Sequence, residues 1–549
     1  MQDPQRFDES HDVIIIGAGS SGSALAGRLS EDPGTSVLVL EAGADVNNWL
    51  GNVPTAAVLM VPSKLHNYAF ETVPQPGLNG RRGYVPRGKM LGGSSGINAM
   101  VYIRGQREDY DEWAALGNTG WGWNDVLPYF IKSECNDSFG APLHGQSGPL
   151  KVSQLRSDNP LQQAWVGAGR EAGHAINADF NGESQEGIGI YQVTQDRGER
   201  CNAARAYLRP HLHRPNLRVT ANAQVQRILF DGRRAVGVEV KVGGQVRRLQ
   251  ARREVVLAAG AIQSPQLLML SGVGDAAQLQ QHGIEVLHHL PGVGANLQDH
   301  PDFVFGLRSK SLDSFGVSLG GGLAFWRALK RYRQERRGML TSNFAEGGCF
   351  LRTSADVARP DVQLHFVVAA VEDHARKLGV GHGLSCHVCL LRPKSRGTLT
   401  LASREVGVAP NIDPAFFQHP DDLAQMVAGF KMTRQLLNQP SLRAHWSREM
   451  WGADAQTDAQ IEALLRQRVD TIYHPVGTCK MGVDAMAVVD PELRVYGLQG
   501  LRVVDASIMP SLISGNTNAP AMMIGEKAAQ MMQAAARRPE AALPLAQAA

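Results

Sequence analysis

The chain has few of the features that mark membrane-spanning, disulfide-rich or nucleic-acid-binding proteins. Its 549 residues include six cysteines, too few for a disulfide framework in a chain of this length. It has no apolar run of about 18 residues, so no transmembrane helix is expected. A formal net charge of +3 gives no reason to expect a nucleic-acid partner. Residues 1–11 lack the apolar centre of a secretory signal, so the sequence predicts a cytoplasmic protein.

Two of the cysteines, Cys386 and Cys389, have the C-x-x-C spacing that is also used to bind zinc. The sequence has no second pair at a matching distance, and the run around these two alternates like a strand. We therefore expect two small buried residues on a strand, and no metal site.

A glycine-rich turn is the strongest positive signal. Residues 13–16 are all apolar and predict a buried strand, and a helix is expected from near Ser20. Gly17, Gly19 and Gly22 follow the G-x-G-x-x-G pattern of dinucleotide-binding βαβ units. In such a unit the first glycine permits a tight turn, the second admits a pyrophosphate, and the third lets helix and strand pack closely. The helix N-terminus then offers unpaired N–H groups to the phosphates.

The segments that follow indicate which dinucleotide is bound. A second apolar run, residues 37–40, ends at Glu41, an acid that can accept both ribose hydroxyls and would repel a 2′-phosphate. This argues against NADP. Three further glycine-rich loops lie at 88–98, 260–274 and 503–520. A nicotinamide enzyme needs one such loop, so four of them predict a larger cofactor buried along its whole length.

The loops at 88–111 and 260–274 carry the two diagnostic patterns of the glucose–methanol–choline (GMC) flavoprotein oxidoreductases, which the chain resembles from about Asp12 to about Met532. Within that family it most resembles bacterial aliphatic alcohol dehydrogenases and choline dehydrogenases. The resemblance implies FAD and an α/β fold (α+β overall), with a Rossmann-like FAD-binding domain interleaved with an antiparallel-sheet substrate domain. The FAD-binding domain is expected at 11–150, 216–304 and 488–535, the substrate domain at 151–215 and 305–487, and a flexible tail at 536–549.

Oxidation of an alcohol by a flavin requires a base for the hydroxyl proton, and histidine suits neutral pH. The best candidate is His474, because Pro475 keeps it extended in a polar loop and the segment resembles the family's catalytic histidine motif. The resemblance also implies a His or Asn opposite this base. The matching residue is Asn518, which could instead cap the helix expected after it. His300 is the next candidate base.

The resemblance assigns the flavin contacts by position. These are Gly17, Gly19, Ser21 and Gly22 at the pyrophosphate, Glu41 at the ribose, the backbone of Val225 at adenine, Gly92, Gly93, Asn98, Met100 and Val101 beside the isoalloxazine, Asp505 and Ala506 at the phosphates, and Asn516 and Thr517 at the ring. Some relatives attach FAD through a histidine in the glycine-rich loop. Ile97 stands at that position here and cannot form the bond, so the FAD should be non-covalent.

Substrate choice is poorly encoded. Phe344, Glu346 and Phe350 belong to a segment that resembles one lining the pocket of relatives. Glu346 could bind a cationic head group such as that of choline, or could be a salt-bridged structural acid. Three other segments resemble the aliphatic alcohol dehydrogenases more than the choline dehydrogenases, namely 178–182, 191–195 and 373–377. We expect primary aliphatic alcohols to be oxidised to aldehydes. Choline oxidation, an oxidase that uses O₂, and a lyase or photodecarboxylase on the same fold remain alternatives.

A basic stretch at 327–337 holds six cations and one acid. Phe325, Trp326, Leu329 and Tyr332 recur at helical spacing beside those cations. Such a helix either lies on an anionic membrane or packs its apolar stripe on its own domain. The first alternative would make the protein peripheral at the inner membrane. It would also bring the protein near a lipid-soluble quinone. A quinone or another carrier is the electron acceptor that we expect.

Overall fold

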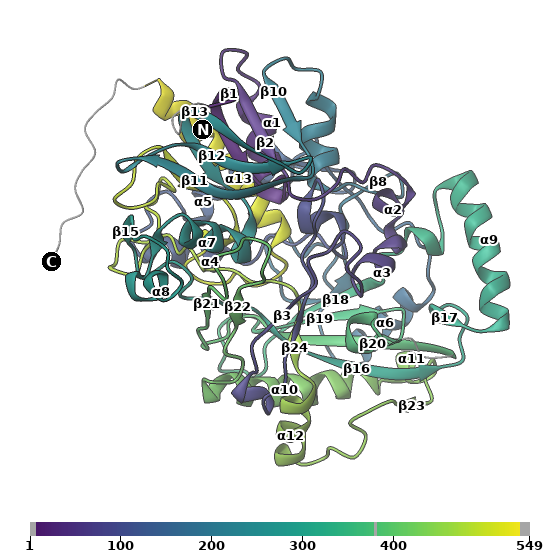
Figure 1. Ribbon diagram of the computed structural model, residues 1–549. Coiled ribbons are helices and arrows are strands. Elements are labelled where there is room, and N and C mark those ends of the chain that lie inside the picture. The colour runs from purple at the N-terminus through teal and green to yellow at the C-terminus, as the bar shows by residue number, and fades with distance from the viewer. Residues whose placement is uncertain (1–6, 378–380, 538–549) are drawn as a thin grey trace.

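The computed structural model describes residues 7–377 and 381–537 (Figure 1). Two large sheets organise this part of the chain, one near the N-terminus of the chain and one at the opposite end of the molecule. The tail predicted at 536–549 lies outside the described residues from 538 onward.

The first sheet is mixed, and its strands come from three separate parts of the chain. They are β1 (Glu9–Ile16), β2 (Val37–Leu40), β10 (Leu217–Thr220), β11 (Ala223–Asp231), β12 (Arg234–Val242), β13 (Gln245–Leu257) and β25 (Leu501–Val503). The order is β10-β2-β1-β13-β12-β11, with β25 beside the end of β13. The centre is parallel, and every residue of β2 is buried, as expected for a strand covered on both faces.

The glycine turn lies where β1 and β2 end together. Ile16 pairs with Leu40, so the turn before α1 (Ser20–Leu29) meets the residue after β2 at one edge of the sheet. α1 packs closely against α13 (Asn518–Ala536). This approach requires Gly525, where a Cβ would lie 2.4 Å from the backbone oxygen of Ser21. The C-terminal helix is thereby attached to the first βαβ unit.

The second sheet is antiparallel and carries its helices on one side. Its strands are β7 (Gly187–Ile190), β16 (Pro301–Ser309), β17 (Gly316–Val317), β18 (Ala345–Leu351), β19 (Val362–Val367), β20 (Gly381–Leu390), β23 (Arg448–Glu449) and β24 (Asp470–Thr471). A hydrophobic core joins β16, β19 and β20 to α6 (Leu161–Glu171), α10 (Pro420–Leu437) and α12 (Asp458–Arg468). Figure 1 shows α10 and α12 on the side of this sheet that faces away from the first sheet.

The other helices lie in the connections. In chain order they are α2 (Trp49–Asn52), α3 (Ala57–Met60), α4 (Arg107–Ala115), α5 (Trp123–Ser133), α7 (Gly260–Leu270), α8 (Ala276–Gln281), α9 (Leu319–Glu335) and α11 (Pro440–Arg443). Within 7–377 and 381–537, none combines the length and apolar character that crossing a membrane requires.

The sequence correctly placed the first two buried strands and the helix between them. Cys386 and Cys389 are buried residues of β20 with free thiols, which confirms the strand interpretation. The residue pattern alone predicts short, separate strands at 247–250 and 254–258, but in the structure both runs belong to one strand, β13. They join because β1 pairs with both runs, while the start of β13 also pairs with β12 and its end with β25.

Candidate active site

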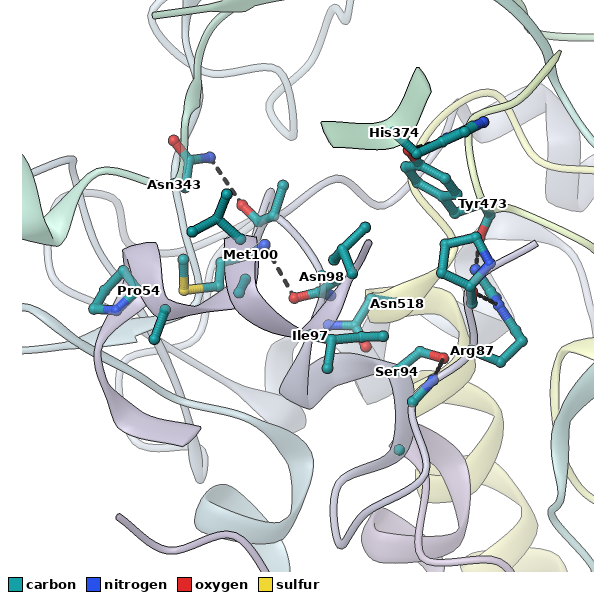
Figure 2. Close-up of a pocket in the computed structure, with 18 of the residues that line it drawn as sticks. Pro54, Arg87, Ser94, Ile97, Asn98, Met100, Asn343, His374, Tyr473 and Asn518 are labelled. Carbon is teal, nitrogen blue, oxygen red and sulfur yellow. Dashed lines mark hydrogen bonds between the residues drawn. The ribbon is translucent and has the colours of Figure 1, made fainter. Parts of the chain in front are cut away.

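A cavity of about 1290 Å³ lies between the glycine-rich loops and the second sheet. Its lining includes the glycine turn, the start of α7, most of residues 86–101 and parts of β18 and β19. In Figure 2, Ile97 and Asn98 occupy the middle of the view, with Pro54 toward one end and Arg87 toward the other. A drug-sized ligand needs about 300–1,000 Å³. The cavity is therefore large enough for a dinucleotide together with a small substrate.

The glycine turn has the close backbone packing that the sequence predicts. Gly17 has a φ of 103°, and a Cβ there would lie 2.5 Å from the oxygen of Ala258. A Cβ at Gly22 would lie 2.0 Å from the oxygen of Gly17, and one at Gly93 would lie 2.8 Å from Cα of Gly19. α1 begins directly after Gly19 without a side-chain cap. Bare backbone and free N–H groups therefore fit a pyrophosphate at this point.

Glu41 follows β2 and is held by the turn itself. Its carboxylate accepts hydrogen bonds from the backbone N–H of Ala18 at 3.0 Å and of Gly43 at 2.8 Å. Burial raises the pKa of Glu41 to about 7, although both hydrogen bonds act to lower it. A ribose bound here would meet an acid whose position is already fixed.

Most residues predicted to hold the cofactor line this cavity. They are Gly17, Gly19, Ser21, Glu41, Gly93, Asn98, Met100, Val101, Val225, Asp505, Ala506, Asn516 and Thr517. Gly22 and Gly92 are not in the lining. Gly22 packs α1 onto the turn, and Gly92, with a φ of 94°, turns the chain beside Asn202. Ile97 is buried and faces the cavity.

His474 lies in the loop after β24, and its two ring nitrogens face different partners. Nε2 is 3.2 Å from Nδ2 of Asn516, in the loop before α13. Nδ1 is 3.0 Å from Nδ1 of His300, which immediately precedes β16. His474 and Asn516 line the cavity, and His300 is fully buried.

The partners of His300 determine where the protons lie. Its Nε2 is 3.0 Å from the carbonyl oxygen of Leu391 and 3.1 Å from that of Ile513, so Nε2 carries a hydrogen. Burial lowers the pKa of His300 to about 3, so the ring is neutral and Nδ1 is an acceptor. His474 must therefore donate its Nδ1–H to His300. In neutral His474 this leaves the lone pair on Nε2.

The partners of Asn516 lead to the same assignment independently. Its Oδ1 lies 3.0 Å from Nε2 of Gln363, which also donates to the hydroxyl of Tyr191 at 2.9 Å. An amide nitrogen only donates, so Asn516 Oδ1 accepts and its Nδ2 is turned to His474 Nε2. Gln363 was not predicted. A signal was available, because Gln363 and His365 are polar residues at alternate positions of an otherwise apolar strand.

Burial also sets the charge of His474. It holds the pKa of His474 well below the usual 6.5, and the neighbouring His300, His365 and Arg87 lower it further. Asp299 holds the backbone, because its carboxylate accepts from the N–H of His474 at 2.9 Å and of His300 at 2.8 Å. The site therefore presents a neutral, fixed imidazole with an unprotonated nitrogen.

Asn518 was expected opposite His474. It lines the same cavity, but the amide within hydrogen-bond distance of His474 Nε2 is that of Asn516. Asn518 begins α13, and its Oδ1 accepts from the hydroxyl of Ser20 at 2.6 Å, at the glycine turn. The two asparagines are only two positions apart, and sequence spacing alone does not tell which of them faces the histidine.

Of the three predicted pocket residues, only Phe344 lines the cavity. Glu346 is fully buried on β18, where its carboxylate accepts from the hydroxyl of Ser342 at 2.6 Å and from Nε2 of Gln162 at 2.7 Å. Phe350 packs edge-on against Phe180, with ring centroids 5.3 Å apart. All seven residues of β18 are buried, so hydrophobic alternation could not show which of them face the cavity.

Comparisons with known proteins agree with this geometry. Family models described as GMC oxidoreductase match residues 11–302 and 393–525. An alcohol dehydrogenase (acceptor) from Pseudomonas putida is 47% identical over 95% of both chains. An oxygen-dependent choline dehydrogenase from Brucella anthropi is 43% identical over 94% of both.

Solved structures give the same result. Pyridoxine 4-oxidase from Mesorbium loti has a TM-score of 0.86 at 30% identity, covering 95% of this chain and 99% of its own. Formate oxidase has a TM-score of 0.89 at 28% identity, covering 96% and 99%. The fold expected from the sequence is thereby confirmed. The chain belongs to the GMC oxidoreductase family, whose members among its relatives oxidise alcohols or choline.

Proposed function

We propose that the protein is an FAD-dependent alcohol dehydrogenase that oxidises primary aliphatic alcohols to aldehydes. The observation that carries this proposal is the lone pair of His474 Nε2, which faces a cavity and is fixed from both sides. The FAD residues would be those listed above that line the cavity. When bound there, FAD supplies a hydride acceptor.

The chain's own residues would activate the alcohol. His474 Nε2 takes the hydroxyl proton, and general-base catalysis of this kind contributes a factor of about 10²–10⁴. Asn516 Nδ2, which donates to His474 Nε2 in this structure, would donate instead to the alcohol oxygen and hold it in place. His300 and Gln363 touch neither the cofactor nor the substrate in this scheme. They act as positioning residues, because each orients one of the two groups that do.

Two observations favour an uncharged substrate over choline. The carboxylate of Glu346 is hydrogen-bonded outside the cavity, so it would not contact the head group of a choline bound there. Arg87 lines the cavity, and its guanidinium donates to the carbonyl of Tyr473 at 2.5 Å. Burial lowers the pKa of Arg87 to about 10, which still leaves it protonated at neutral pH. A fixed cation beside His474 repels a quaternary ammonium.

The FAD would be non-covalent, since Ile97 provides no nucleophile. Acid precipitation of the holoenzyme should therefore leave the yellow chromophore in the supernatant. Colour that stays in the pellet would show a covalent link. The electron acceptor would be a quinone or another carrier, so reoxidation of the reduced enzyme by a soluble quinone should be faster than by O₂.

The substrate assignment is tested by anaerobic reduction of the bound flavin in the dark. A series of primary alcohols of increasing chain length is compared with choline in stopped-flow experiments. We expect aliphatic alcohols to bleach the flavin faster than choline. Preferential reduction by choline would make the protein a choline dehydrogenase. No reduction by any alcohol would favour a lyase or a photodecarboxylase.

A further inference from the structure

Large apolar side chains are exposed around the mouth of the cavity. Trp49 on α2 is 64% exposed, Leu59 on α3 is 48% exposed, and Phe325 on α9 is 52% exposed, and all three line the cavity. Trp326, next to Phe325, is 69% exposed. Such residues are costly to leave in water when they lie together, and patches of this kind mark interaction surfaces. We call Trp49, Leu59, Phe325 and Trp326 the rim.

α9 is attached to the body of the protein by one side only. Ala328 and Tyr332 are buried and form a small core with Leu340, against which Leu329 and Val53 also pack. Trp326, Lys330 and Arg333 are spaced i, i+4 and i+7, so they share a face of the helix, and all are exposed. Figure 1 shows α9 at the edge of the molecule, beyond α2 and α3. The packing interpretation is thus correct for one side of the helix and leaves the other side open.

The cations of this region divide into two groups. Arg331 and Arg337 both pair with Asp158, at 2.6 Å each, and Arg336 pairs with Glu199 at 3.3 Å. These pairs attach α9 and the following turn to the body of the protein. Arg327, Lys330 and Arg333 form no ion pair with any residue in the described part of the chain, and each is exposed. Three uncompensated positive charges therefore stand beside the rim.

We propose that the rim and these three cations dock the protein on an anionic lipid surface, with the mouth of the cavity facing the lipid. Tryptophan and phenylalanine suit the interface between headgroups and acyl chains, and nearby Lys and Arg attract anionic headgroups. A second copy of this chain fits the surface less well, because two sets of three positive charges would face each other. This docking does not depend on which alcohol is oxidised.

The placement has a consequence for access to the cavity. Because Trp49, Leu59 and Phe325 belong both to the rim and to the cavity lining, an apolar molecule can leave the membrane and enter without crossing water. A long-chain alcohol or a lipid-soluble quinone has the chemistry that this route would admit.

The first test is co-sedimentation of the holoenzyme with vesicles. The wild type should bind vesicles that contain phosphatidylglycerol at low salt, should be released at high salt, and should not bind pure phosphatidylcholine. Each cation near a membrane contributes about 1 kcal/mol. The double variant Arg327→Gln, Lys330→Gln should therefore bind about 30-fold more weakly. A matched control, Arg233→Gln with Lys241→Gln, removes one exposed cation from the turn between β11 and β12 and one from β12, and it should bind like the wild type.

The second test asks whether the rim itself enters the lipid. Trp49 and Trp326 are the most exposed of the tryptophans in the described residues, and the others are buried or half-buried. Phospholipids brominated on their acyl chains should quench tryptophan fluorescence in the wild type but not in a Trp49→Phe, Trp326→Phe variant.

Reduction of the flavin by a soluble short-chain alcohol should be unchanged in the Arg327→Gln, Lys330→Gln variant, which shows that it is folded. The proposal is overturned if the wild type stays in the supernatant with anionic vesicles at low salt. It is also overturned if the Arg233→Gln, Lys241→Gln control loses binding as much as the Arg327→Gln, Lys330→Gln variant, or if Trp326→Ser abolishes a dimer rather than vesicle binding.

Discussion

Replacement of His300 tests whether the tautomer of His474 is set by its hydrogen-bond partner. His300→Leu removes the only acceptor assigned to His474 Nδ1–H while keeping a buried side chain of similar size. His300→Gln is the matched variant. Its side chain has one acceptor and one donor group, so it can accept from His474 and donate to the carbonyl of Leu391 as the histidine does.

The size of the effect follows from burial. In the leucine variant the Nδ1–H of His474 has no partner in a site that excludes water, and an unsatisfied buried donor costs about 1–3 kcal/mol. The ring avoids this cost by moving its hydrogen to Nε2, but it then presents no lone pair to the alcohol. We therefore expect a rate lower by about 5- to 150-fold, since about 1.4 kcal/mol is a factor of ten. The glutamine variant should lose less than about fivefold.

The assay is the limiting rate of anaerobic flavin reduction at saturating alcohol, with FAD content and KM measured beside it. A structural role alone would affect both variants alike or would release FAD. A positioning role lowers the rate in His300→Leu, retains FAD, and is rescued in His300→Gln. A leucine variant that reduces its flavin at the wild-type rate would refute the proton assignment.

Three further predictions follow from the same contacts. Because burial lowers the pKa of the base, flavin reduction in the wild type should decline with acid only well below pH 6.5, and an acid limb above 7 in the pH profile would contradict this. Gln363→Glu replaces the donor to Asn516 Oδ1 by an acceptor, so the Asn516 amide should turn over and present its oxygen to His474. That oxygen favours a protonated His474, so the acid limb of the pH profile should move to higher pH. An acid limb at the wild-type pH would count against the role of Gln363. Burial lowers the pKa of His144, but hydrogen bonds to Asp179 and Glu134 outweigh this and raise it overall. The stability that His144 contributes is therefore complete below 6.5 and lost as pH rises through the raised pKa, so His144→Gln should lower the Tm more at about pH 6 than at about pH 9.

Local sequence signals were enough to place the glycine-rich turn between the first buried strand and the helix that follows it. The turn at Gly17 needs a positive φ and close backbone contacts, which only glycine provides, so its identity and place could be deduced directly. The residue pattern also predicts helices at 422–438 and 457–468, and α10 and α12 begin and end within two residues of these bounds.

The contacts around His474 join distant segments of the chain, and the spacing of residues in the sequence does not encode such contacts. Gln363, Asn516 and His300 meet His474 or one another across separations of 42 to 174 residues. Glu346 was predicted as a pocket residue because its segment resembles one that lines the pocket of relatives. Its partners, Ser342 and Gln162, are visible only in three dimensions.

The most direct test of the central claim is the rate of flavin reduction in His474→Gln. If His474 is the base that takes the alcohol proton, the limiting rate should fall by about 10² or more while FAD stays bound, since general-base catalysis contributes on that order. Asn516→Ala should lose less, because it removes one hydrogen bond and no proton acceptor. A His474→Gln enzyme that reduces its flavin at nearly the wild-type rate would contradict the account and move the role of base to another group.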